Sequence, residues 1–110
     1  MARYVDGPHA GNSLRVGITG GVPTDIRGPF EERFGARLAE SYGMTEAEPI
    51  ALQYPGSPAD SVGRPTPDFE LSILDGEDNP LPQGRRGEIG IRPRRPHVMF
   101  AGYEDDPEAT

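Results

Sequence analysis

The fold is decided by residues 14–41, which read LRVGITGGVPTDIRGPFEERFGARLAES. Residues 14–19 form a short apolar run that favours β-structure, as in a buried strand. The turn after it, Gly20-Gly21-Val22-Pro23, has two glycines that free the backbone and a proline that cannot continue a central strand. Residues 37–41 predict a second strand after an intervening helix. A strand, a helix and a strand within about 28 residues predict a βαβ unit with parallel strands and a right-handed crossover.

The predicted helix has an apolar stripe and a defined end, but two possible starts. Its large apolar residues recur every four positions, at Ile26, Phe30 and Phe34. A helix that begins after Thr24 loses the backbone hydrogen bond from Pro29, whereas a helix capped by Gly28 places the proline at the favoured first position. Both starts are compatible with the sequence. Gly35 is typical of a left-handed residue that ends a helix.

A loop rich in functional groups is predicted directly after the second strand, at Tyr42-Gly43-Met44-Thr45-Glu46. Tyr42 offers a flat amphipathic ring, and Gly43 lets backbone approach closely. Thr45 offers a hydroxyl and Glu46 a carboxylate, and both groups suit a phosphate-bound Mg²⁺. The stretch therefore predicts a nucleotide and magnesium site.

The 20–23 turn and the 42–46 loop both follow strands of the predicted βαβ unit. Because the carboxyl ends of parallel strands lie at one edge of a sheet, both segments are expected at the same edge. Open α/β sheets bind their ligands at that edge. The two segments together therefore predict a binding site there.

The second half of the chain predicts a separate small β layer. Apolar and polar residues alternate in 50–54, 69–73 and 89–91, and the last two runs predict an antiparallel hairpin with a long loop. A short edge strand is expected at 62–65, a last strand at 98–103 and the start of a helix at 106–110. The fold class is α/β: a βαβ portion of a mainly parallel sheet, then a small antiparallel layer. The predicted division is an irregular lead-in (1–13), an α/β portion (14–54) and a β-rich portion (55–110).

Composition limits the class of protein. The chain has 110 residues, which fits one small domain or part of a larger one, and its net charge of −7 argues against nucleic acid or an anionic membrane as a partner. The lack of cysteine fits a reducing compartment, and no apolar run is long enough to span a bilayer, so a cytoplasmic protein is expected. All eleven basic residues are arginine, which excludes a Walker-type phosphate loop and a Schiff-base lysine within this chain.

Five motifs occur in a fixed order: Gly20-Gly21-Val22-Pro23, Tyr42-Gly43-Met44-Thr45-Glu46, Gly63-Arg64-Pro65, Gly87-Glu88-Ile89, and Gly102-Tyr103 with Pro107-Glu108-Ala109-Thr110. Together they resemble the adenylate-forming (AMP-binding) superfamily, which includes acyl-CoA synthetases, firefly-type luciferases and nonribosomal-peptide adenylation domains. The resemblance covers residues 14–110. Residues 98–103 look most like CoA ligases of the crotonobetaine/carnitine type.

The resemblance implies a reaction and a set of site residues. In this superfamily a carboxylate is joined to ATP, pyrophosphate is released, and a thiol, usually that of CoA, then takes the acyl group from the acyl-adenylate. By resemblance Tyr42 stacks on adenine, and the catalytic residues are Thr45, which contacts phosphate, and Glu46, which holds Mg²⁺. The other implied residues are Val22, Pro23, Gly43 and Met44 for ATP, and Gly20 and Gly21 at the border of the acyl pocket. Val22 replaces the usual alanine and Ser41 stands where glycine is common, and both could reshape the pocket.

The superfamily also has parts that this sequence does not match. Its lysine-bearing phosphate loop would lie before the 20–23 turn, and its ribose-binding aspartate and lysine-bearing C-terminal domain would lie after Thr110. The chain is therefore expected to be an internal piece of the large N-terminal domain, with part of a barrel-like subdomain, and to be inactive alone. Its expected partners are a small carboxylic acid, ATP, CoA and the missing parts of the same enzyme. The alternative is a non-catalytic, truncated nucleotide-binding or structural module.

Overall fold

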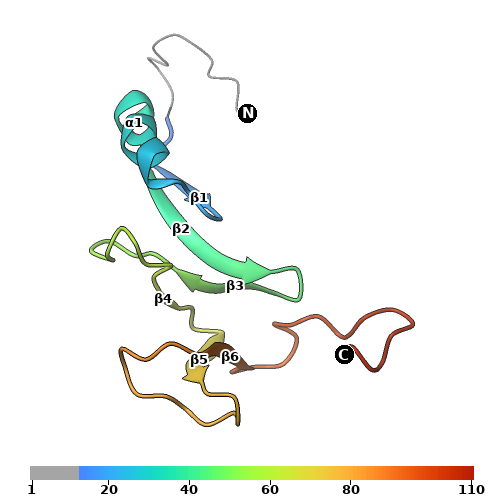
Figure 1. The fold of residues 1–110 in the computed structure, drawn as a ribbon. Coiled ribbons are helices and arrows are strands. Elements are labelled where there is room, and N and C mark those ends of the chain that lie inside the picture. The colour runs from blue at the N-terminus through green and yellow to red at the C-terminus, as the bar shows by residue number, and fades with distance from the viewer. Residues whose placement is uncertain (1–12) are drawn as a thin grey trace.

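The computed structural model describes residues 13–110, so the predicted lead-in lies outside the described part except for Ser13. The elements, in chain order, are β1 (Val16–Thr19), α1 (Thr24–Phe34), β2 (Arg37–Met44), β3 (Ala47–Leu52), β4 (Arg64–Pro65), β5 (Phe69–Leu74) and β6 (Glu88–Pro93). They form a four-stranded sheet in the order β1-β2-β3-β4 and a two-stranded sheet of β5 and β6. Figure 1 shows the short β4 leading from the first sheet to the second.

The predicted βαβ unit is confirmed. Strands β1 and β2 pair in parallel, with Val16 opposite Arg37 and Thr19 opposite Glu40, and α1 is the crossover between them. The predicted α/β fold class is therefore confirmed. Only this pair of the four-stranded sheet is parallel, because β2 with β3 and β3 with β4 pair antiparallel. The predicted hairpin of β5 and β6 is also antiparallel, from Phe69 opposite Pro93 to Leu74 opposite Glu88.

Helix α1 takes the earlier of its two possible starts. It begins at Thr24, its N-cap residue is Pro23, and Pro29 lies inside it. The Pro23 carbonyl oxygen accepts hydrogen bonds from Ile26 N at 3.0 Å and Arg27 N at 3.2 Å, which forms the first turn before the proline is reached. Gly35 ends the helix in the left-handed conformation with a φ of 60°, as predicted.

Polar contacts, rather than buried apolar side chains, hold α1 to the sheet. None of the helix residues is buried, and the two phenylalanines of its stripe pack on each other with ring centroids 4.4 Å apart. Arg27 Nη1 donates to the Leu38 carbonyl oxygen at 2.8 Å, and Leu38 N donates to Glu31 Oε1 at 2.7 Å. Each side chain thus bonds a backbone group of the neighbouring β2 strand.

The expectation of a buried strand at residues 14–19 is wrong for the described part of the chain. The strand is present as β1, but Val16 is 49% exposed and Ile18 is 66% exposed. Gly17 faces the other way, towards the Leu38 side chain, since an added Cβ would lie 3.0 Å from Leu38 Cδ2. Within residues 13–110 no element covers the face that carries Val16 and Ile18.

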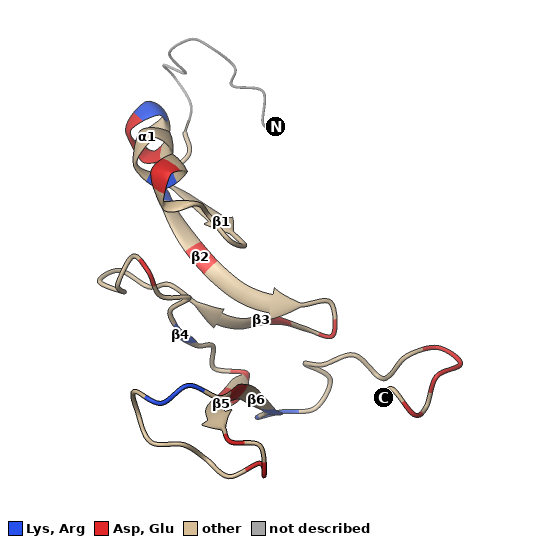
Figure 2. Cartoon of the chain, in the orientation of Figure 1, with Lys and Arg blue, Asp and Glu red and all other residues tan. Residues whose placement is uncertain are grey.

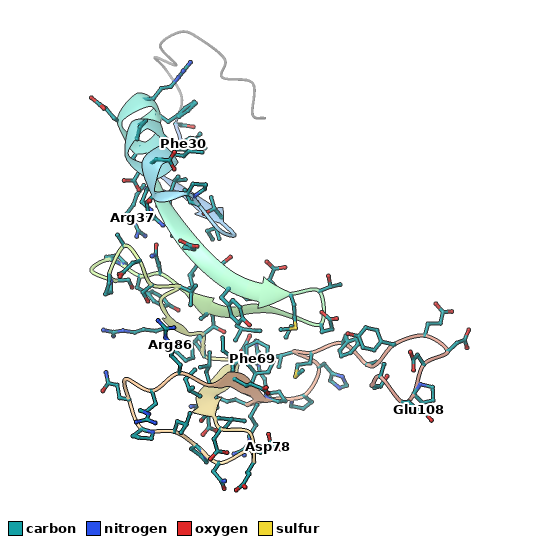
Figure 3. All side chains as sticks on the ribbon, viewed as in Figure 1. Phe30, Arg37, Phe69, Asp78, Arg86 and Glu108 are labelled. Atoms are coloured by element: carbon teal, nitrogen blue, oxygen red, sulfur yellow. The ribbon has the colours of Figure 1, made fainter. Side chains whose placement is uncertain are left out.

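The two sheets meet at a small core. Its buried members are Ala47, Ile50 and Phe69. Phe69 opens β5 but is only 2% exposed, because it packs against β3 residues of the other sheet (Figure 3). The side chains of Tyr42, Leu71, Ile91, Val98 and Met99 are partly buried around this cluster. Phe69 is therefore the main apolar link between the α/β portion and the β-rich portion.

Two predicted elements near the end of the described chain do not form. Residues 98–103 are irregular rather than a strand, apart from a bridge between Tyr103 and Asp106. Residues 106–110 form a turn rather than a helix, although Ala109 N donates to the Asp106 carboxylate at 3.1 Å as in a helix cap. The Thr110 hydroxyl bonds the Asp106 carbonyl oxygen at 3.0 Å, where a helix would use a backbone N–H. In the described part of the chain, no helix is long and apolar enough to cross a membrane.

Candidate functional site

The predicted 42–46 loop is mostly strand. Tyr42, Gly43 and Met44 complete β2, and only Thr45 and Glu46 form the turn to β3. The prediction of a loop from residue 42 is wrong because β3 folds back along β2 and pairs with its last residues. The pairing is irregular between Tyr42 and Met44, which is typical of a β-bulge and turns side chains out of strict alternation.

The 20–23 turn and the 42–46 segment lie near the same edge of the sheet, but the 42–46 segment extends further along the strand direction. Thr19 is the last residue of β1 and lies opposite Glu40, and the Ser41 hydroxyl donates to the Thr19 carbonyl oxygen at 3.3 Å. Strand β2 continues for four residues past Glu40, to Met44, which is about 13 Å of extended chain. The 20–23 turn is therefore beside Ser41, and Thr45 and Glu46 project further along the same direction.

Gly43 lies at a close approach of backbone within the protein, where an added side chain would be crowded. A Cβ at this position would lie 3.0 Å from Glu48 Cγ and 3.1 Å from the Ala47 carbonyl oxygen. The predicted close approach of backbone is thus confirmed, and the neighbour is the start of β3. Tyr42 next to it is half-buried and packs its ring against the core cluster of Ala47, Ile50 and Phe69.

Glu46 is bound by a tyrosine that sequence reasoning did not connect with it. The Tyr103 hydroxyl donates a hydrogen bond to Glu46 Oε1. This bond lowers the pKa of the Glu46 carboxyl below its ordinary value, with help from the residue's own backbone N–H, and it raises the pKa of the Tyr103 phenol. The two residues are 57 positions apart in the sequence, so no local pattern could have predicted the contact. At neutral pH Glu46 is an anion and Tyr103 a neutral donor.

The 20–23 turn, the other predicted segment, has more free space around its glycines than Gly43 has. An added Cβ at Gly20 or Gly21 would meet no atom within 4 Å, and Gly21 has a φ of 69° that favours glycine. Val22 is half-buried and Pro23 is exposed at the start of α1. The glycines thus leave free space beside the end of β1, and Pro23 has a structural task in starting the helix.

A magnesium ion at this turn would be coordinated jointly by the protein and a substrate, and not by protein side chains alone. Among residues 13–110 no three His, Cys, Asp or Glu side chains are close enough to hold a metal ion. Mg²⁺ is commonly bound through one or two carboxylates together with substrate phosphates and water. Glu46 supplies one carboxylate whose Oε2 atom is hydrogen-bonded to no other described residue, and the exposed Thr45 is adjacent. This donor set suits a cation that arrives with a nucleotide.

A polar network behind the site was also missed. Gln53 is only 4% exposed, and its Oε1 atom accepts from Glu40 N at 3.0 Å and from Arg27 Nη1 at 3.2 Å. Its Nε2 atom donates to the Pro58 and Ser61 carbonyl oxygens. The network ties α1, β2 and the loop after β3 together, and it thereby supports the strand that carries the site. A single glutamine carries no sequence signal for such a role.

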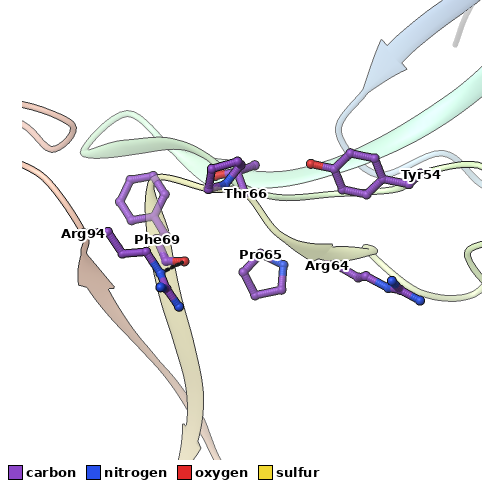
Figure 4. Close-up of a pocket in the computed structure, with 7 residues that line it drawn as sticks. Tyr54, Arg64, Pro65, Thr66, Phe69 and Arg94 are labelled. Atoms are coloured by element: carbon purple, nitrogen blue, oxygen red, sulfur yellow. Dashed lines mark hydrogen bonds between the residues drawn. The ribbon is translucent and has the colours of Figure 1, made fainter.

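An open depression lies between the two sheets, away from these residues. Its lining is formed by Tyr54, Arg64, Pro65, Thr66, Pro67, Phe69 and Arg94 (Figure 4). Arg94 Nε donates to the Phe69 carbonyl oxygen at 3.2 Å, and the Thr66 hydroxyl donates to the Pro49 carbonyl oxygen at 2.8 Å. None of the predicted site residues lines it. The turn after β2 and the loop near Thr110 lie outside this depression, and both carry acidic residues (Figure 2).

Comparison with known proteins supports the family resemblance that the motif order indicated. A family profile described as "AMP-binding enzyme" matches residues 3–103. The chain is 36% identical over 103 residues to the mitochondrial acyl-coenzyme A synthetase ACSM5 of Rattus norvegicus, a match that covers 88% of this chain and 18% of that protein. The chain thus spans less than a fifth of the length of this relative.

Solved structures show the same fold. The structure of a putative long-chain-fatty-acid CoA ligase from Rhodopseudomonas palustris matches with a TM-score of 0.77 and 29% identity, over 89% of this chain and 24% of that one. The amide bond synthetase McbA from Marinactinospora thermotolerans matches with a TM-score of 0.70 and 37% identity, over 87% of this chain and 20% of that one. Because the family profile covers nearly the whole chain and the relatives share its fold, the chain belongs to the AMP-binding enzyme family.

Proposed function

We propose that this chain is part of an ATP-dependent carboxylate–CoA ligase. The observation that carries the proposal is the family match over residues 3–103, with an exposed Thr45 and a half-buried Glu46 in the turn at the end of β2. In the first step a substrate carboxylate oxygen attacks the α-phosphorus of ATP, the bond to the pyrophosphate oxygen breaks, and an acyl-adenylate forms. In the second step the CoA sulfur attacks the acyl carbon, its proton is lost, and AMP leaves.

The proposed task of the turn is positioning and charge balance. Phosphoryl transfer needs its oxygens held and their negative charge neutralised more than it needs a protein nucleophile. Glu46 would hold Mg²⁺, which neutralises phosphate charge when bound, and the Thr45 hydroxyl would donate to a phosphate oxygen. Both side chains belong to a two-residue turn between paired strands, so their backbone positions are set by the sheet.

The remaining site roles are proposals on the same basis. Tyr42 would present the exposed part of its ring to adenine while its buried part packs on the core. Val22, Pro23, Gly43 and Met44 would form the rest of the ATP-binding wall, and Gly20 and Gly21, which have free space beside them, would border the acyl group. The identity of the acid is left to residues outside this chain.

The proposed enzyme would also need lysine-bearing segments that residues 1–110 do not contain. The chain holds no lysine, whereas the family resemblance implies one in a phosphate loop and one in a C-terminal domain. We therefore expect residues 1–110 alone to form no acyl-CoA. The alternative is a non-catalytic module. Such a protein would lack the lysine-bearing phosphate loop and the lysine-bearing C-terminal domain. A cytoplasmic location stays a prediction, and the rat relative is mitochondrial by name.

ATP–pyrophosphate exchange in the full-length protein that carries this chain tests the proposal. We expect carboxylate-dependent exchange, and Glu46→Gln should reduce it strongly because the neutral amide binds Mg²⁺ poorly. Glu48→Gln is the matched control, since Glu48 is exposed just beyond the same turn and has no described hydrogen bond or ion pair. Unchanged exchange in Glu46→Gln would refute the role of Glu46. No exchange with any carboxylic acid tested would favour the non-catalytic module.

A further inference from the structure

The segment after β6 holds Glu46 at two points. The Tyr103 hydroxyl donates to Glu46 Oε1, and Phe100 N donates to the Glu46 carbonyl oxygen at 2.8 Å. The first bond orients the side chain, and the second orients the backbone of the same residue. The position of this turn residue therefore depends on residues 98–103, which have no regular secondary structure of their own.

Tyr103 is itself held in place. Its ring packs edge-on against Phe100, with centroids 4.8 Å apart and an interplanar angle of 70°. Its backbone N donates to the Thr110 hydroxyl oxygen at 2.9 Å, and that hydroxyl donates to the Asp106 carbonyl oxygen at 3.0 Å. A donor fixed in this way loses little further rotational freedom when it bonds a carboxylate.

The chemistry of the pair suits a metal ligand. The phenol occupies one carboxylate oxygen of Glu46, and no other described residue is hydrogen-bonded to the second oxygen, Oε2. Carboxylates that bind metals are typically oriented by a hydrogen bond that a neighbouring group donates to them. A phenol gives that bond without bringing positive charge, whereas an arginine in its place would repel the cation. Within residues 13–110 no arginine forms an ion pair with Glu46.

We propose that Tyr103 is a positioning residue that orients the Glu46 carboxylate for Mg²⁺ through its hydroxyl. The inference rests on the proposed function, because it takes Glu46 as the Mg²⁺ ligand. Tyr103 does not touch the cation or the substrates in this role. It restricts the rotation of the Glu46 side chain, so that the free oxygen is ready to bind the metal together with the nucleotide.

The experiment compares Tyr103→Phe with Tyr54→Phe in the full-length ligase. Both substitutions remove one hydroxyl from a tyrosine of similar exposure, 45% for Tyr103 and 41% for Tyr54, and the Tyr54 hydroxyl has no described hydrogen bond. Mn²⁺ binding in the presence of a non-hydrolysable ATP analogue is measured by electron paramagnetic resonance, which is independent of turnover. Pyrophosphate exchange is then followed against Mg²⁺ concentration, and thermal unfolding of each variant is recorded.

Tyr103→Phe should weaken Mn²⁺ binding about tenfold, the lower end of the effect of removing an orienting partner. It should raise the Mg²⁺ concentration for half-maximal exchange by a similar factor and leave the rate at saturating Mg²⁺ close to the wild-type rate. Tyr54→Phe should change neither quantity. Unchanged Mn²⁺ affinity in Tyr103→Phe would overturn the inference, as would a lower melting temperature and rate with the same metal dependence.

The failure of this inference differs from the failure of the proposed function. If Glu46→Gln abolishes Mn²⁺ binding while Tyr103→Phe binds like wild type, only the role of Tyr103 is refuted. If Glu46→Gln itself binds Mn²⁺ like wild type, the magnesium role of Glu46 is refuted, and the role of Tyr103 is refuted with it.

Discussion

Arg27 Nη2 of α1 lies 3.0 Å from Glu40 Oε2 of β2, and the two side chains are only 14% and 18% exposed. The same guanidinium donates to the Leu38 carbonyl oxygen and to Gln53 Oε1. One arginine thus joins the helix to the strand that ends in the proposed site. The apolar stripe of α1 contributes no buried residue to this contact.

Replacing Arg27 by methionine should destabilise the protein substantially. The change leaves the Glu40 carboxylate, the Leu38 carbonyl and Gln53 Oε1 with fewer partners in a poorly solvated site. We expect a loss of about 2–4 kcal/mol in the free energy of unfolding, measured by urea denaturation. Arg37→Met is the control, because Arg37 is exposed and its side chain has no described hydrogen bond. Equal stabilities of the two variants would contradict the role given to Arg27.

Gly63 should tolerate no side chain. A Cβ there would lie 2.0 Å from the Leu52 carbonyl oxygen, and the residue has a φ of 95°. Gly56 has a similar φ of 87°, but no atom lies within 4 Å of its added Cβ. Gly56→Ala should therefore lose about 1 kcal/mol for the backbone conformation alone, whereas Gly63→Ala should lose several times more or fail to fold. Similar melting temperatures for the two variants would exclude the clash with β3.

Removing the Phe69 side chain should loosen the two sheets from each other. Phe69→Ala empties the centre of the small core and should reduce the free energy of unfolding by about 3–5 kcal/mol, measured in urea. Ile89→Ala, at a half-exposed position of β6 outside that core, should have a much smaller effect. A Phe69→Ala protein as stable as Ile89→Ala would show that the sheets are joined by other contacts.

Asp75 should make the β5–β6 hairpin sensitive to acid. Hydrogen bonds from the backbone N–H groups of Asn79 and Glu77 lower the pKa of the Asp75 carboxyl below its ordinary 3.8. A lowered folded-state pKa stabilises the protein above pH 3.8, and this contribution is lost as the pH falls through the folded-state pKa. A carbon-detected NMR titration should place the Asp75 midpoint below 3.8. Asp75→Asn should remove this part of the acid dependence, and a midpoint at or above 3.8 would contradict the turn geometry.

Local patterns were sufficient for most of the secondary structure. The apolar run before Gly20, the helical spacing that ends at Gly35 and the alternation in β5 and β6 each act over a few residues, and each predicted its element correctly. The motif order also predicted the family that the comparisons then showed. These features depend on backbone preferences and side-chain periodicity, which are properties of the sequence itself.

The remaining features depend on contacts between distant residues, and only the tertiary structure decided them. Tyr42 to Met44 became strand because β3 returned to pair with them, and the face of Val16 and Ile18 is exposed because no described element covers it. Glu46 meets Tyr103 because the segment after β6 lies against the turn after β2. The sequence alone determined the family, through the order of its motifs, and it supplied the residues that we propose for the chemistry. The folded chain decided which side chain is hydrogen-bonded to the Glu46 carboxylate, because a hydrogen bond across 57 residues has no local signature.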